Sequence, residues 1–220
     1  MSFPHRISGN IALDLANTIS WRGTDRETDH LTTVDDIVAW AKEAGLIDSR
    51  FAIPAHERGA LVNRTMALRS AITEAGSAIA HHKDAPASAL DVIRDLAAGA
   101  LQASEISGAP VTFAFQGIDK IVGAVAWSAL DLLRGDELPR LKQCPPDDCH
   151  WLFIDRTKNG SRRWCDMGTC GNRAKKQVFR KERSGASPSE QASSELRRIR
   201  GSQDERGHVG RKRGRRTNSA

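Results

Sequence analysis

The sequence predicts an α+β chain in three parts. These are a mostly helical N-terminal domain over residues 1–140 with a short strand pair or hairpin, a small hairpin-plus-helix module over 141–183, and a disordered basic tail over 184–220. Three observations predict this organisation. Apolar residues recur at helical spacing through most of 1–140. All four cysteines fall between residues 144 and 170, and the tail has no aromatic residue and few branched aliphatic ones.

The charge of the chain is divided unevenly. Residues 1–140 carry 13 Lys and Arg against 18 Asp and Glu, a net charge of −5, whereas residues 141–220 carry 20 against 9, a net charge of +11. A strongly basic end favours a polyanion as its partner. No run of 18 apolar residues exists, which excludes a membrane span and a membrane partner. Because no secretory signal is visible at the N-terminus, we expect a cytoplasmic location.

Local signals place the first two helices. Residues 11–19 put apolar side chains on one helical face, although residues 11–15 also alternate as in a strand; we favour the helix. Thr33 and Asp36 form a capping-box pattern with Asp in place of Glu. Gly45 supplies a left-handed stop, so a second helix is expected between these signals.

Two prolines and one alternating segment place the remaining elements. Pro54 and Pro86 can each start a helix, and Val111–Phe115 alternates large and small residues as a strand does. A last helix is expected from about Ile118 to Arg134. The inward face of the helix after Pro86 is expected to carry Leu90, Ile93, Leu96, Ala97 and Leu101.

Two cysteine pairs of equal spacing are the strongest chemical signal in the chain. Cys144 and Cys149 form one C-x4-C pair, Cys165 and Cys170 form the other, and 15 residues separate the pairs. Four thiolates at this spacing suit a tetrahedral zinc ion. Since four cysteines leave no open coordination position, we expect one structural Zn²⁺ and no catalysis at the metal.

The segment between the pairs is predicted to be a hairpin. Residues 151–154 are typical of a strand, Asn159-Gly160 of a tight turn, and residues 161–164 of the returning strand. Residues 171–183 then form a short amphipathic helix. A module of this size has too little core to fold unaided, so the ion would supply folding free energy.

Other interpretations of the thiols stay open at this point. They could be ordinary buried thiols or a redox-sensing pair. Iron is also held by four thiolates, and His150 could replace Cys149 as a ligand.

Basic residues around the cysteines exceed what the metal site requires. Four thiolates and one Zn²⁺ sum to −2, whereas residues 173–183 alone carry six cations. Four of them recur at helical spacing, so they form one stripe suited to phosphates. The alternative is a solvated face, or a surface that docks on the acidic body. The expected nucleic-acid-binding residues are Arg162, Arg163, Arg173, Lys175, Lys176, Arg180, Lys181 and Arg183.

At these residues the sequence resembles a known family. Residues 165–173, Cys-Asp-Met-Gly-Thr-Cys-Gly-Asn-Arg, contain the Cys-Gly-Asn-Arg signature of the CGNR zinc finger, and residues 152–155 and 162–165 also match its pattern. Residues 9–18 resemble the opening of the ABATE domain that usually precedes this finger. The resemblance covers about residues 5–183. It implies a bacterial transcription regulator whose finger binds DNA and whose N-terminal domain serves sensing or assembly.

The combined hypothesis is a zinc-dependent, DNA-binding transcription regulator, in which the basic tail adds sequence-independent affinity. Two alternatives come from other classes. An RNA-binding zinc module would use Trp151 and Trp164 to stack on unpaired bases. A protein-interaction adaptor would use the finger, with its structural zinc, to bind an acidic partner.

A small-molecule effector is a further expected partner. Asp14, Asn17 and Arg22 interrupt an otherwise apolar opening and could line its site. The alternative is that they are caps and buried hydrogen bonds that fix the N-terminal segment. Because the body shows no spaced nucleophile motif, we expect no enzyme activity.

Overall fold

The computed structural model describes residues 6–185. The chain divides into two compact units, with the boundary in the sequence between Gly171 and Asn172. The first unit holds the helical body together with all four cysteines, and the described part of the second unit is the helix α6 (Asn172–Gly185). The tail predicted for 184–220 lies, from residue 186 onward, outside the described residues.

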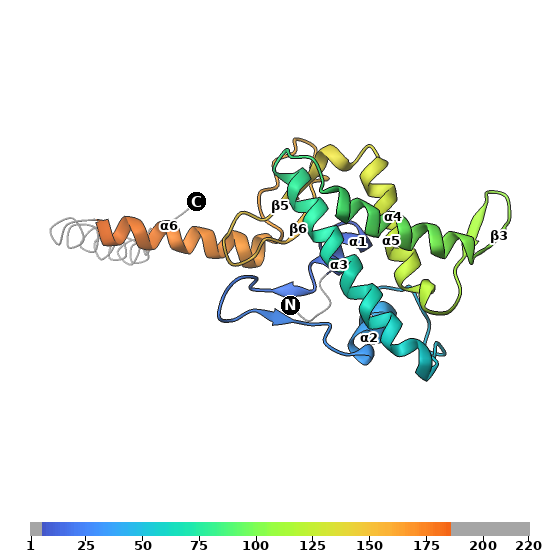
Figure 1. Cartoon of the computed structure of the whole chain (residues 1–220). Helices are drawn as coiled ribbons and strands as arrows, with labels where there is room; N and C mark the ends of the chain where they lie inside the picture. The colour runs from blue at the N-terminus through green and yellow to red at the C-terminus, as the bar shows by residue number, and fades with distance from the viewer. Residues whose placement is uncertain (1–5, 186–220) are drawn as a thin grey trace, which may run out of the picture. The chain divides into compact units, whose positions relative to one another are not determined.

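The first unit is predominantly helical, as predicted (Figure 1). In it α3 and α4 each pack against α5, α4 packs along α3, and the short α1 contacts both α3 and α5. Short helical turns lie between the longer elements: η1 (Ala55–Glu57), η2 (Gly117–Lys120), η3 (Leu138–Arg140) and η4 (Met167–Gly171). The helices are α1 (Ile11–Ala16), α2 (Val34–Glu43), α3 (Arg58–Ala80), α4 (Ala87–Gln102) and α5 (Val122–Arg134).

Side-chain caps explain where the first two helices begin. The Asn10 side chain accepts hydrogen bonds from the backbone N–H groups of Ala12 and Leu13, which starts α1 and settles the helix-or-strand ambiguity in favour of the helix. Thr33 and Asp36 form the predicted capping box of α2. Gly45 follows α2 with φ of +76°, the left-handed conformation that glycine adopts without strain.

The core of the first unit is aliphatic. Apolar faces of α3, α4 and α5 meet around α1, which is buried along most of its length. One predicted core position is wrong: Leu90 is 39% exposed, because it lies near the start of α4 beside an open pocket, although it shares a helical stripe with the buried Ile93 and Ala97. Fully buried members of the core include Leu13, Leu15, Leu61, Leu68, Ile93 and Val125.

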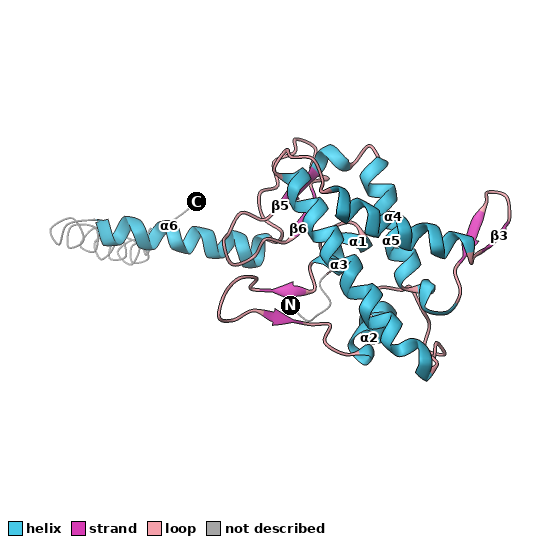
Figure 2. Cartoon of the chain, viewed as in Figure 1, coloured by secondary structure: helices cyan, strands magenta, loops and turns pink. Residues whose placement is uncertain are grey.

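Three two-stranded antiparallel sheets accompany the helices in the described part of the chain (Figure 2). The predicted strand is confirmed as β4 (Thr112–Ala114), and it pairs with β3 (Glu105–Ser107). A second pair joins β1 (Ile19–Ser20) to β2 (Thr28–Asp29). The third joins β5 (Leu141–Gln143) to β6 (Leu152–Ile154).

The hairpin predicted between the two cysteine pairs has different strands in the structure. β6 occupies the predicted position, but its partner is β5, which precedes it in the sequence, with Lys142 opposite Phe153. Residues 161–164 form no strand. The backbone N–H of Arg162 instead donates to the carboxylate of Asp155, which holds the chain in an irregular loop. The first cysteine pair therefore lies within the hairpin connection, rather than before the hairpin.

Candidate metal centre

Four cysteine sulfurs converge at one point in the first unit. The Sγ atoms of Cys144, Cys149, Cys165 and Cys170 all lie within 4.8 Å of one another, and all four residues are buried. The Sγ of Cys165 lies 3.6 Å from that of Cys149 and 3.5 Å from that of Cys170. A tetrahedral zinc site with Zn–S bonds of about 2.3 Å separates its sulfurs by about 3.8 Å. The spacing therefore matches a four-thiolate ion site.

The protonation of the cysteines also points to a cation. Hydrogen bonds from Cys149 and Cys165 lower the pKa of the Cys144 thiol, since they favour its thiolate. The same contact with Cys144 raises the pKa of Cys149 and of Cys165 far above the usual thiol value. Several thiolates so close together would repel one another in a buried site. A divalent cation between the sulfurs removes this repulsion. The four cysteines therefore fit one Zn²⁺ and leave no open coordination position.

The first cysteine pair is positioned by the β5–β6 hairpin. Cys144 directly follows β5, and its N–H donates to the carbonyl of Trp151 at 2.8 Å, which extends the ladder beyond the strand. Cys149 closes a turn by donating its N–H to the carbonyl of Pro146 at 3.0 Å. His150 turns the chain back with φ of +57°. The cluster of ligand atoms in the described residues consists of the four sulfurs and does not include the His150 ring.

The second cysteine pair is positioned by a turn that is held by its own side chains. The N–H of Cys165 donates to the Sγ of Cys144 at 3.3 Å, a contact that joins the two pairs. The Asp166 carboxylate accepts from both the N–H and the hydroxyl of Thr169, at 2.6 and 2.8 Å. This turn leads into η4, where Cys170 faces the other sulfurs.

Arg162 braces the loop beside the cysteines. Its guanidinium lies 4.4 Å from the centre of the Phe153 ring and donates to the carbonyls of Trp164 and Ile7, each at 3.0 Å. It also donates to the carbonyl of Cys165. These contacts place Arg162 in the frame of the metal site, and its nucleic-acid role stays a prediction.

Asp155 is the buried anion of this frame. Its carboxylate accepts from the Lys142 ammonium at 2.6 Å, from the N–H and hydroxyl of Thr157 at 3.0 and 2.5 Å, and from the Arg162 N–H at 2.9 Å. Burial raises the pKa of Asp155, but the hydrogen bonds from Lys142 and Thr157 outweigh it, and the pKa lies well below its usual range. Lys142 also donates to the carbonyl of Gly160 at 2.6 Å, which ties the loop to β5.

The helical body supplies the other side of the site. The Asn17 side chain, just after α1, donates to the carbonyl of Leu152 and accepts from its N–H, both at 2.8 Å. The indole N–H of Trp151 donates to the carbonyl of Ile19, and the N–H of Ile154 donates to that of Ser8, again at 2.8 Å each. The hairpin that carries Cys144 is therefore hydrogen-bonded to the N-terminal segment at both ends of β6.

Two family models match the chain. The model of the CGNR zinc finger matches residues 140–183, and the model of the ABATE domain, described as "Putative stress-induced transcription regulator", matches residues 9–136. The chain belongs to the ABATE family. Its zinc finger contains the four-cysteine site described above, which holds one structural zinc. Both descriptions name regulator or zinc-finger types rather than enzymes. Among curated proteins no match is found.

The residues predicted to line an effector site lie in the ABATE domain but form internal contacts. The buried Asp14 carboxylate accepts from the N–H of Ser8, and Asn17 clamps β6 as described. Arg22 donates to the carbonyl of Ala16 at 3.1 Å. Burial and the neighbouring Arg69 lower the pKa of Arg22, while acidic neighbours and the Cys149 sulfur act to raise it. An effector role for these residues stays a prediction.

The remaining basic residues of the finger lie at its surface. Arg163 is exposed, with its guanidinium 5.5 Å from the Trp164 ring centre. Along α6, Lys175, Lys176 and Arg180 are exposed and Arg173 is half-buried. The side chains of Lys181 and Arg183 lie outside the described residues.

Sequence reasoning found the four sulfurs but missed the residues of the ABATE domain that support them. Asn17 and Leu152 are 135 positions apart, and no local pattern links them. The available signal is a polar residue in an apolar segment, which the sequence explains by a ligand site or by caps and buried hydrogen bonds; the structure shows buried hydrogen bonds at Asn17.

We predict that Asp155→Asn destabilises the zinc-loaded ABATE protein by about 2–4 kcal/mol at pH 7. The amide would place its own N–H group against the donors that now face a carboxylate. Because Lys142 is partly exposed, solvent screening favours the lower end of this range. Urea unfolding at pH 7 measures the loss, and Asp136→Asn, at an exposed position, is the matched control.

The acid dependence of this effect has a definite sign. The pKa of Asp155 is lowered by folding, so its stabilisation is complete above the unfolded value of about 3.9 and is lost as the pH falls through the folded value. The difference between wild type and Asp155→Asn should therefore stay constant from pH 7 to about 5. A difference that disappears within this interval would contradict the role given to the carboxylate.

Proposed function

We propose that the chain is a zinc-dependent transcription regulator that binds DNA through its zinc finger and the helix that follows it. The observation that carries this proposal is the position of α6, which begins two residues after the zinc ligand Cys170 and presents Lys175, Lys176 and Arg180 to solvent. Cations at helical spacing can follow a line of phosphates.

The function of each part follows from its surface. Arg163 and α6 would contact phosphates or guanine edges, and the net charge of +11 over residues 141–220 would attract the duplex. The ABATE domain, with its own net charge of −5 over residues 1–140, would serve sensing or assembly rather than DNA contact. Such a regulator acts in the cytoplasm and catalyses no reaction. In the described part of the chain no helix is long and apolar enough to cross a bilayer.

RNA is a weaker candidate because of Trp151. This side chain is buried and its indole N–H is bound to the Ile19 carbonyl, so it offers no face to an unpaired base. Of the two tryptophans predicted to stack on bases, only the half-buried Trp164 is left as a candidate.

A salt titration with labelled nucleic acids tests the proposal. Fluorescence anisotropy with a random-sequence 30-base-pair DNA duplex should give an affinity that falls steeply with salt, by about 0.9 in log K per unit log [salt] for each phosphate contacted. Lys175→Gln combined with Lys176→Gln should reduce this slope by the amount expected for about two phosphate contacts. Lys42→Gln combined with Lys83→Gln removes the same charge from exposed positions of the ABATE domain and should leave the slope unchanged.

Competition then separates the alternatives. Single-stranded RNA that displaces the duplex at lower concentration would favour the RNA module. A salt-independent affinity, or the same affinity for both double variants, would reject electrostatic binding by α6 and favour a protein-interaction adaptor. A genome-wide binding footprint of the intact chain would connect DNA binding to transcription, because it identifies the promoters that are occupied.

A further inference from the structure

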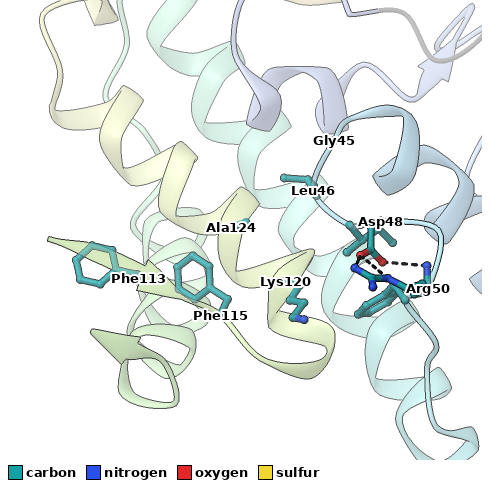
Figure 3. A pocket seen from close by; sticks show the side chains of 10 residues that line it. Gly45, Leu46, Asp48, Arg50, Phe113, Phe115, Lys120 and Ala124 are labelled. Carbon is teal, nitrogen blue, oxygen red and sulfur yellow. Dashed lines mark hydrogen bonds and ion pairs between the residues drawn. The ribbon is translucent and has the colours of Figure 1, made fainter. Parts of the chain in front are cut away.

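An open pocket of about 760 Å³ lies in the ABATE domain and shares no residue with the zinc site. One wall is the loop after α2, from Gly45 to Phe51. The other is formed by β4, η2 and the start of α5, through Phe113, Phe115, Lys120 and Ala124 (Figure 3). Small-molecule sites in proteins have volumes of about 300–1,000 Å³, so this pocket has the size for a ligand.

Phenylalanine side chains lie on both walls of the pocket. Phe113 and Phe115 come from the β4 side, Phe51 comes from the opposite loop, and all three are half-buried. Phe113 packs edge-on against Trp127, with the ring centres 5.1 Å apart and the planes at 64°. This contact stabilises the orientation of the Phe113 ring. Phenylalanine on both walls suits a flat apolar ring.

The charged residues of the pocket leave one cation in excess. Arg50 donates its Nε and Nη2 to one oxygen of Asp48, at 3.3 and 3.0 Å, so these two charges compensate each other. Hydrogen bonds from Arg50, with a contribution from the charge of Lys120, lower the pKa of Asp48 and keep it ionised. Lys120 is exposed at the end of η2, and no ion pair to it is found within residues 6–185. At neutral pH the lining therefore carries a net charge of +1.

We propose that this pocket binds a small aromatic carboxylate, with its ring between the phenylalanine walls and its carboxylate against Lys120. An anionic head matches the uncompensated cation, and a planar body matches the rings. The pocket, rather than the contacts of Asp14, Asn17 and Arg22, is then the effector site of the ABATE domain. This regulatory consequence rests on the proposed function, whereas the binding itself does not, so the test uses the protein without DNA.

Calorimetric titration of the zinc-loaded full chain with benzoate and with 1-naphthoate tests the binding. Each acid is compared with its neutral amide, which has nearly the same shape but no charge. We expect saturable binding of at least one acid with one site per chain, and affinity for the matching amide lower by about tenfold or more. No saturable binding of either acid at millimolar concentration, or equal affinity for acid and amide, would overturn the proposal.

Two variants locate the site. Lys120→Gln should weaken carboxylate binding about tenfold and leave amide binding unchanged. Ala124→Trp should fill the pocket and abolish binding of both. Lys83→Gln, an exposed lysine that lines no part of the pocket, is the control. Thermal unfolding of each variant verifies that it is folded. Undiminished carboxylate binding by a folded Lys120→Gln protein would contradict the assignment, whatever the outcome of the DNA titration.

Discussion

Removal of zinc from the finger is expected to destabilise the whole first unit rather than the cysteine-bearing segment alone. Leu141, Leu152 and Ile154 of the β5–β6 hairpin belong to the same buried cluster as the helices of the ABATE domain. The hairpin is held in place by Cys144 at the end of β5, so loss of the ion loosens part of the body's own core. We expect the protein to lose most of its unfolding free energy when the metal is chelated.

The magnitude follows from typical values. Structural zinc contributes about 10–16 kcal/mol to the folding of zinc-finger peptides at neutral pH, whereas a whole domain is stable by about 5–15 kcal/mol. The melting temperature should therefore fall by at least about 10 °C on addition of a strong chelator. Circular dichroism at 222 nm measures this fall, because the signal comes mainly from the helices of the body. Added zinc should restore the transition, and added magnesium should not. The same helical melting temperature with and without zinc would contradict the coupling.

The second large effect is expected for Asn17→Ala. Asn17 is 4% exposed and forms two hydrogen bonds of 2.8 Å with the backbone of Leu152. Its removal leaves a buried N–H and a buried carbonyl without partners, which costs about 2–4 kcal/mol. Because Leu152 belongs to the hairpin that carries Cys144, the variant should also release zinc to a colorimetric chelator faster than the wild type.

A matched control separates this clamp from general effects of asparagine removal. Asn159 is exposed in the loop that follows β6, so Asn159→Ala should change the stability by less than about 0.5 kcal/mol. Urea unfolding of both variants in the presence of zinc gives the comparison. If Asn17→Ala were as stable as Asn159→Ala and released zinc at the same rate, the clamp would have no role in holding the finger.

Much of the fold could be predicted because its signals are local. Thr33, Asp36 and Gly45 lie within a few positions of the helix ends that they determine, and the structure confirms them. The four sulfurs were also accessible, since equal spacing within each pair reflects the reach of a short turn around one ion. For these features, the residues that decide the structure lie close together in the chain.

Features that depend on distant partners could not be predicted. Residues 161–164 were expected to be the returning strand after the Asn159-Gly160 turn, but the carboxylate of Asp155 binds the Arg162 N–H, and β6 pairs with the three-residue β5. A strand that short has no periodicity to detect. Leu90 fits the helical pattern of α4 yet is exposed, because periodicity places a residue on a face but does not show how far the neighbouring helices extend over it.

The different surroundings of two neighbouring arginines in the finger also could not be predicted from the sequence. Arg162 and Arg163 are adjacent and chemically identical, so sequence reasoning gave both the same nucleic-acid role. In the structure Arg162 binds carbonyls around the zinc site, whereas Arg163 is exposed.

Metal analysis of the purified chain tests the central claim, that one zinc ion is bound by the four cysteines. Native mass spectrometry should find one zinc ion per folded chain, and all four cysteines should resist alkylation until a chelator is added. A folded chain that carries no metal, and whose four thiols react freely with iodoacetamide, would contradict the account.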